Sequence, residues 1–65
     1  MRDGEKVTLT VRRPNQDITV VLQAHDDEWF VIYSVDEVGY QAQLTGLERA
    51  NVKARAHRGE DETGL

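Results

Sequence analysis

Glu28–Val35, which reads EWFVIYSV, contains the only tryptophan and the only phenylalanine of the 65-residue chain. Six of its eight residues are β-branched or aromatic, a composition that is typical of a strand. Its apolar residues do not alternate cleanly with polar ones, so both faces of the strand need shielding from water. We therefore expect Glu28–Val35 to form the central strand of a small β domain.

Two stretches before this strand show the period-two pattern of half-buried strands. Val7–Arg12 alternates apolar and polar residues, and Ile18–Ala24 places its apolar residues mainly on one face. Arg13–Asp17, which contains the only proline, and His25–Asp27 are polar and separate the expected strands. The pattern predicts an antiparallel meander. The expected inward residues are Val7, Leu9 and Val11 in the first strand, and Ile18, Val20, Leu22 and Ala24 in the second.

A fourth strand is expected after the central one. Asp36–Gly39 has the Asp and Gly positions of a type I turn. In Val38–Thr45 the apolar residues alternate with polar ones, which predicts a strand with one face in water.

Residues 47–57 fit two structures. Thr45 precedes Glu48 by three residues, the spacing of a capping box, and Gly59 suits a helix C-terminus, so one interpretation is a helix. The other is a one-turn helix followed by a fifth strand, which would close the sheet against the first strand. We expect the strand, because a helix would place Val52 away from its other apolar residues. The inward residues of that strand are Val52, Ala54 and Ala56.

The stretch Leu44–Val52, LTGLERANV, resembles the ending of SH3-like and Sm-like small barrels. The C-terminal domain of the ribosome maturation factor RimP ends in a similar way, although its frequent second-strand glycine is absent here. The C-terminal dimerisation domain of the plasmid repressor KorB is a second family that the chain resembles. That likeness rests on the spacing of Trp29, Tyr33, Ala42, Leu44 and Val52. These resemblances imply a fold and no functional residues.

The expected fold is all-β, a small five-stranded SH3-like barrel over residues 1–58 with a one-turn helix before the last strand. A charged, flexible tail is expected at 59–65. The alternative fold is a four-stranded antiparallel meander followed by a C-terminal helix.

The composition limits what the chain does. It has no cysteine, which excludes disulfides and thiolate zinc sites and suits the cytoplasm. No apolar run approaches the roughly 20 residues that cross a bilayer, and Met1–Glu5 is unlike a signal peptide, so we expect a cytoplasmic protein without membrane contact. Glu60–Glu62 contribute −3 of the formal net charge of −4, so the other residues carry −1. That balance does not favour duplex DNA binding through bulk charge.

The chain offers little for catalysis. His25–Asp27 is the one cluster of histidine and carboxylates, and neighbouring strand-end residues point in different directions, so we interpret it as a solvated turn. Asp36 and Glu37 are expected at a turn tip. A chain of this length has little room for a substrate pocket of roughly 300 Å³. We expect no enzyme activity, no metal, no cofactor and no small-molecule substrate.

The central strand predicts a partner. If Trp29 and Tyr33 fill a barrel, then Phe30 and Ile32 project outward, and Val21 joins them. Exposed apolar surface of this kind usually marks an interaction site. We therefore expect a non-catalytic module that binds a protein partner or forms a homodimer. The expected partner-binding residues are Val21, Phe30 and Ile32, with Arg12 and Arg55 in the polar surroundings.

The alternative function is contact with RNA or the ribosome through a basic face. In the five-strand arrangement the outward residues of the first and last strands lie side by side. The expected nucleic-acid-binding residues are Arg12, Arg13, Arg49, Lys53 and Arg55.

Overall fold

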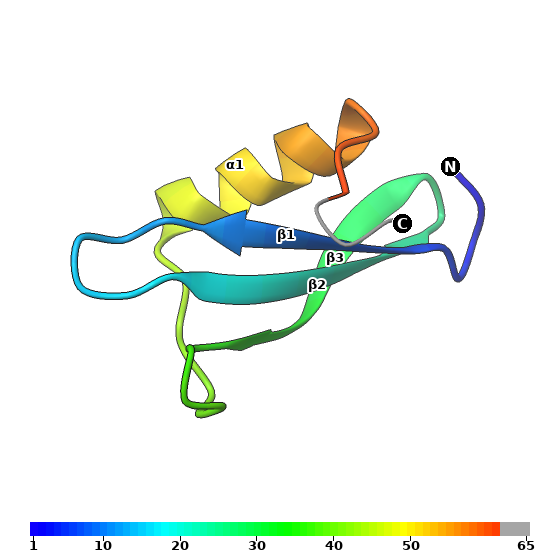
Figure 1. Cartoon of the computed structure of the whole chain (residues 1–65). Coiled ribbons are helices and arrows are strands. Elements are labelled where there is room, and N and C mark those ends of the chain that lie inside the picture. The colour runs from blue at the N-terminus through cyan, green and yellow to red at the C-terminus, as the bar shows by residue number, and fades with distance from the viewer. Residues whose placement is uncertain (62–65) are drawn as a thin grey trace.

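The structure, a computed structural model, describes residues 1–61 of the chain. Within these residues it has three strands and one helix: β1 (Lys6–Val11), β2 (Ile18–His25), β3 (Glu28–Val35) and α1 (Gly46–His57). The strands form one antiparallel sheet in the order β1-β2-β3, and α1 lies across one face of it (Figure 1). The sheet is open and the fold mixes α and β structure, so the expected five-stranded SH3-like barrel is wrong.

The hydrophobic core lies between the sheet and α1. The alternation expected for β1 and β2 is confirmed, and Leu9, Val20 and Leu22 are fully buried. Burying one large aliphatic side chain stabilises a fold by about 1.5–3 kcal/mol, so this layer is the main source of stability. The buried members of the core are Val7, Leu9, Ile18, Val20, Leu22, Ala24, Trp29, Leu44, Val52 and Ala56.

α1 forms in place of the expected fifth strand because both of its ends are capped. The Oγ1 atom of Thr45 accepts a hydrogen bond from the Glu48 N–H at 3.1 Å, and Glu48 Oε1 accepts one from the Thr45 N–H at 2.9 Å. At the other end Gly59 has a φ of +82°, and the N–H groups of Gly59 and Glu60 donate to carbonyls of the last turn. The helical interpretation of this segment is therefore the correct one.

α1 presents another face to the sheet than the one expected for a helix. Val52 and Ala56, one turn apart, are buried, whereas Leu47 is 72% exposed. The sequence argument against a helix assumed that Leu47, Ala50 and Ala54 would lie inward and leave Val52 outside. In the structure Ala50 and Ala54 are exposed, so the helix is rotated and Val52 packs into the core.

β3 contains a β-bulge that interrupts its alternation. Leu22 pairs with Val31 and Val21 pairs with Tyr33, so Ile32 is an additional residue without a partner in the ladder. Beyond the bulge the inward and outward positions of β3 are exchanged relative to the sequence expectation. Tyr33, expected in the interior, is 52% exposed as a result.

The expected fourth strand, Val38–Thr45, does not form. Its pairing with β3 is an isolated bridge between Val35 and Gln41. The Ala42 N–H donates to the Ser34 carbonyl at 3.0 Å, and the Ser34 hydroxyl donates to the Ala42 carbonyl. The chain then leaves the sheet to enter α1, so the four-stranded meander of the alternative fold is also wrong.

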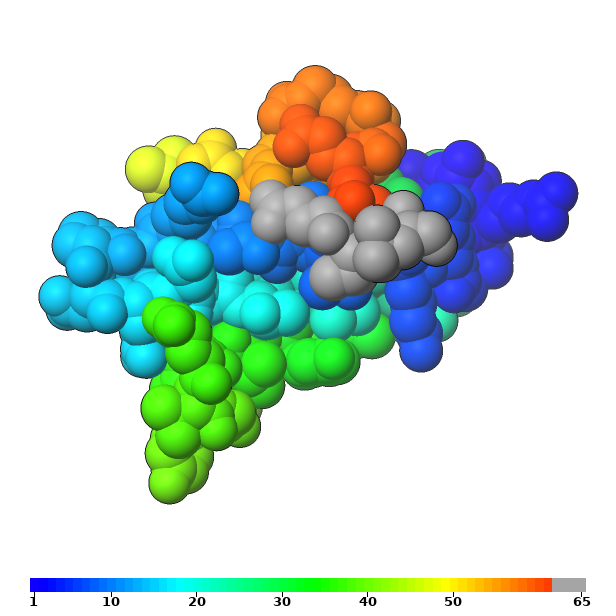
Figure 2. All heavy atoms as spheres, viewed as in Figure 1, coloured from blue at the N-terminus to red at the C-terminus, as the bar shows by residue number. Residues whose placement is uncertain are grey.

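The turn between β3 and this segment has the expected residues. The Gly39 N–H donates to the Asp36 carbonyl at 3.1 Å, and Gly39 has a φ of +104°. The Asp36 carboxylate accepts three further backbone hydrogen bonds, and the one from Tyr40 does most to lower its pKa. Residues 36–40 project from the body of the molecule (Figure 2).

The end of the described chain returns to the sheet. Of the expected tail 59–65, residues 62–65 lie outside the described residues. Asp61 Oδ1 accepts a hydrogen bond from the Thr8 N–H of β1 at 3.2 Å. Within residues 1–61 there is no helix whose length and apolar content would let it cross a membrane.

Candidate functional site

β3 carries a row of exposed apolar side chains. Phe30, Ile32 and Tyr33 are 43%, 42% and 52% exposed. Phe30 lies opposite Gln23 and Tyr33 opposite Val21, and these two β2 residues are separated by one position, so all four face away from the core. Phe30, Ile32 and Tyr33 are called the β3 patch below.

Exposed apolar residues continue along the chain beyond β3. Val38 and Tyr40, in the projecting turn, are 73% and 71% exposed. Val21, which was expected to belong to the partner site, lies beside Tyr33 in the sheet and outside the core cluster. It is only 7% exposed, so it supports the β3 patch from below and offers little contact surface itself.

Cationic side chains of α1 border the β3 patch. The Lys53 Nζ lies 5.8 Å from the centroid of the Phe30 ring, which is the distance of a cation–π contact. Arg49 lines a hollow of about 210 Å³ together with Ile32 and Tyr33. The polar surroundings of the patch therefore come from the helix.

Arg12 and Arg55, which were expected to surround the patch, lie at the other edge of the sheet. They line a groove of about 560 Å³ between the end of β1 and α1, which is called the β1 groove below. Because β1 and β3 are the two edges of the sheet, the expected partner-binding residues are divided between two surfaces. Other residues that line the β1 groove are Thr10, Val11, Glu48, Asn51, Val52, Ala54 and Arg58.

Two of the arginines that line the β1 groove already bind a carboxylate of the chain. Arg55 Nε donates to Glu60 Oε1 at 3.0 Å, and Arg58 Nε donates to Glu60 Oε2 at 3.1 Å. The hydrogen bond from Arg55, followed by that from Arg58, lowers the pKa of Glu60. Arg55 Nη1 also donates to the Thr10 carbonyl at 2.8 Å, which links α1 to the edge of β1.

Sequence reasoning missed Arg58 as a member of this surface. Arg55 and Arg58 are three residues apart, and side chains at that spacing are neighbours on a helix. Their proximity follows from the sequence once residues 46–57 are assigned to a helix. In the expected strand the two side chains would point to opposite faces.

The five residues expected to bind nucleic acid do not share one face. Arg12 and Arg55 line the β1 groove, Arg49 lines the hollow beside β3, and Lys53 lies against Phe30. Arg13 donates to both oxygens of a carboxylate in the first turn of α1 and is engaged there.

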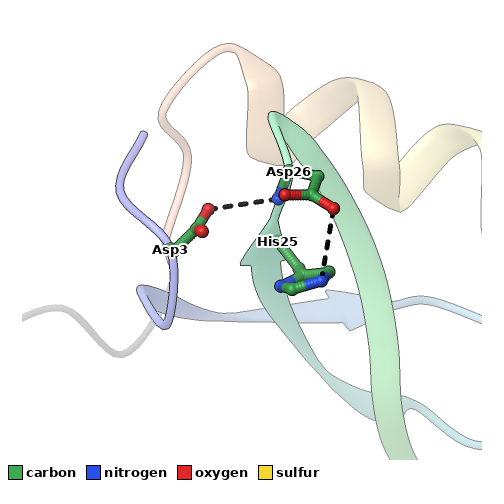
Figure 3. A group of neighbouring side chains, drawn as sticks. All are labelled: Asp3, His25 and Asp26. Carbon is green, nitrogen blue, oxygen red and sulfur yellow. Dashed lines mark hydrogen bonds and ion pairs between the residues drawn. The ribbon is translucent and has the colours of Figure 1, made fainter.

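Asp3, His25 and Asp26 bring three possible metal-ligand atoms within 4.8 Å of one another (Figure 3). Asp3 Oδ1 accepts a hydrogen bond from the Asp26 N–H at 3.1 Å, and His25 Nε2 lies 3.4 Å from Asp26 Oδ2. The third member of this group is Asp3, whereas the sequence suggested a cluster of His25 with Asp26 and Asp27. All three side chains of the group are exposed. We interpret these three residues as a set of contacts that holds the N-terminal segment against the β2–β3 turn.

Comparisons of the chain with protein-family models, with curated proteins and with solved structures found no match.

Proposed function

We propose that the chain is a non-catalytic protein-interaction module that associates with a second copy of itself through the β3 patch. The observation that carries this proposal is the row of three large apolar side chains, each more than two-fifths exposed, on one edge strand. Apolar surface bordered by polar residues is typical of protein–protein contacts. A cysteine-free chain of 65 residues also has a small core, and association adds burial that a single copy lacks.

Charge complementarity favours a second copy as the partner. Lys53 lies at the Phe30 end of the β3 patch, and the acidic residues Asp36 and Glu37 follow the other end of β3. A two-fold axis through the patch would therefore bring the cationic end of one copy towards the acidic end of the other. Three side chains make a small contact, so we expect a weak dimer in exchange with the monomer.

Sedimentation velocity over a wide range of protein concentration tests this proposal. We expect the sedimentation coefficient of the wild type to rise with concentration. The double variant Phe30→Ser with Ile32→Ser should remain a monomer throughout the range. Leu47→Ser is the control, because it removes an even more exposed apolar side chain from α1 and should leave the rise unchanged. A wild type that stays monomeric at every concentration contradicts the proposal.

RNA binding has less support as the function of the chain. It would need several cationic side chains on one surface, and of the five expected ones only Arg12 and Arg55 line the same groove. None of the residues within 1–61 that line that groove is aromatic, so the described chain offers no ring there to stack on bases. We therefore treat RNA as a competing ligand in the experiment described below.

A further inference from the structure

The β1 groove lies at the opposite sheet edge from the β3 patch and needs an explanation of its own. We propose that the β1 groove binds an extended acidic peptide of a partner protein, which adds to the edge of β1 as a further strand. The proposal does not depend on self-association through the β3 patch.

The backbone of β1 offers hydrogen-bonding groups at its outer edge. In an antiparallel pair, alternate residues direct their N–H and C=O groups away from the neighbouring strand. The Thr8 N–H donates to Asp61 Oδ1, and the Thr10 carbonyl accepts from Arg55 Nη1, so both groups point away from β2. Side chains occupy the places that the backbone of an added strand would take, and strand addition at such an edge is a recurring mode of peptide recognition.

The charge of the β1 groove selects the kind of peptide. Arg12, Arg55 and Arg58 place three guanidinium groups along it, although the chain as a whole carries a net charge of −4. The carboxylate of Glu48 also lines the groove, but both of its oxygens accept hydrogen bonds from Arg13. Guanidinium groups donate paired hydrogen bonds to carboxylates. The carboxylates of Glu60 and Asp61 already lie at this edge, where they show the interactions that an acidic ligand would make.

The β1 groove is large enough for a ligand, and the geometry of an added strand sets the spacing of the acidic residues in the peptide. Its volume of about 560 Å³ is within the range of ligand sites, roughly 300–1,000 Å³. Alternate side chains of an added strand point to the same face, so every second residue would face α1 and its arginines. The ligand is therefore expected to carry Asp or Glu at alternate positions. Glu60 competes with it for Arg55 and Arg58 from within the chain.

Fluorescence anisotropy with a labelled octapeptide, four repeats of Thr-Glu, tests the proposal. We expect the double variant Arg12→Gln with Arg58→Gln to bind it at least tenfold more weakly than the wild type. Arg49→Gln, which removes an arginine outside the groove, should change the affinity less than twofold. Glu60→Gln should bind at least as tightly as the wild type. Equal losses in the double variant and in Arg49→Gln would mean non-specific charge attraction and overturn the proposal.

Two further probes separate strand addition from simple anion binding. Four repeats of Pro-Glu carry the same charge but lack the N–H groups that would face β1 in an antiparallel addition, so they should bind at least tenfold more weakly. The amide signals of Thr8 and Thr10 should shift when the Thr-Glu peptide is added to ¹⁵N-labelled protein. Equal binding of the two peptides, or unchanged β1 amides, contradicts strand addition.

The same assay distinguishes the peptide from a nucleic acid and the groove from the β3 patch. An eight-nucleotide oligouridine that binds at least tenfold more tightly than the Thr-Glu peptide and displaces it would make the groove an RNA site and overturn the proposal. Phe30→Ser should retain peptide binding, and the Arg12 and Arg58 double variant should retain self-association. Failure of one proposal is therefore separable from failure of the other.

Discussion

Arg13 donates two hydrogen bonds to the carboxylate of Glu48, from Nε at 2.9 Å and from Nη2 at 2.8 Å. The same Nη2 donates to the Gln43 carbonyl at 2.6 Å. Glu48 also caps α1, while Arg13 lies in the connection between β1 and β2, so one carboxylate joins the hairpin to the helix. This contact holds the first turn of α1 at the end of the sheet remote from the β2–β3 turn (Figure 1).

The Arg13–Glu48 contact predicts a loss of stability in acid. The hydrogen bonds from Arg13 are the largest cause that holds the pKa of Glu48 at about 2, below its ordinary value. A carboxyl whose pKa is lowered by folding stabilises the fold above its unfolded pKa, and this contribution disappears as the pH falls through the folded pKa. We expect the free energy of unfolding, measured with urea, to decrease from about pH 5 to pH 2.

The variant Glu48→Gln tests whether the Glu48 carboxylate causes this pH dependence of the free energy of unfolding. It should be less stable than the wild type at pH 7, and its stability should fall less steeply in acid. The lowered pKa values of Asp36 and Glu60 leave a smaller slope of the same sign in the variant. Identical slopes for the variant and the wild type would contradict the assignment.

The N-cap of α1 predicts how much the fold is destabilised when the Thr45 hydroxyl is removed. Thr45→Ala removes the acceptor of the Glu48 N–H, so we expect the free energy of unfolding to fall by about 1 kcal/mol. Thr45→Ser retains a capping oxygen and should remain close to the wild type. Urea denaturation followed by circular dichroism measures both. An unchanged stability in Thr45→Ala would mean that this hydroxyl does not cap a helix.

The orientation of α1 predicts opposite outcomes for two apolar residues of the helix. Val52 is fully buried, so Val52→Ala should reduce the free energy of unfolding by about 2 kcal/mol. Leu47 is 72% exposed, and Leu47→Ala should be nearly neutral. Thermal and urea unfolding of the two variants measure the difference. The reverse order would mean that the helix presents Leu47 to the sheet.

The β2–β3 turn predicts a stabilising substitution. Asp26 and Asp27 have φ values of 51° and 62° and form a two-residue turn between His25 and Glu28. Glycine adopts positive φ without the steric cost that Asp incurs, so Asp27→Gly should raise the free energy of unfolding by about 1 kcal/mol. Asp17→Gly, at a position without positive φ, is the control and should not stabilise the fold. Lower stability of Asp27→Gly would contradict this turn geometry.

The sequence predicts β1 and β2 well because both alternate apolar and polar residues, whereas the same alternation in Val38–Thr45 does not produce a strand. The apolar positions of β1 and β2 face the core as expected, and Trp29 does so in β3. The bulge at Ile32 was not predictable, because EWFVIYSV fits either register and the choice is made by pairing with β2. Tyr33 is exposed as a consequence, and it enlarges the surface that Phe30 and Ile32 were expected to form.

α1 shows that the capping residues predict the structure of residues 47–57 better than the expectation that a fifth strand closes the sheet. The capping box of Thr45 and Glu48 and the glycine at 59 were visible in the sequence, and both cap α1 in the structure. The assumption that every edge needs a neighbouring strand favoured the barrel. In the structure the side chains of Arg55, from α1, and of Asp61 contact the β1 edge where the fifth strand was expected. The Arg13–Glu48 contact joins residues 35 positions apart and has no local signature.

The concentration dependence of the amide spectrum tests self-association through β3 most directly. Spectra of ¹⁵N-labelled protein, recorded at dilute and concentrated conditions, report which residues the second copy contacts. We predict that amide shifts of Phe30, Ile32 and Tyr33 change with concentration, while those of β1, at the opposite edge of the sheet, stay constant. Spectra that superimpose at all concentrations, or changes confined to residues outside β3 and the turn that follows it, would contradict the account.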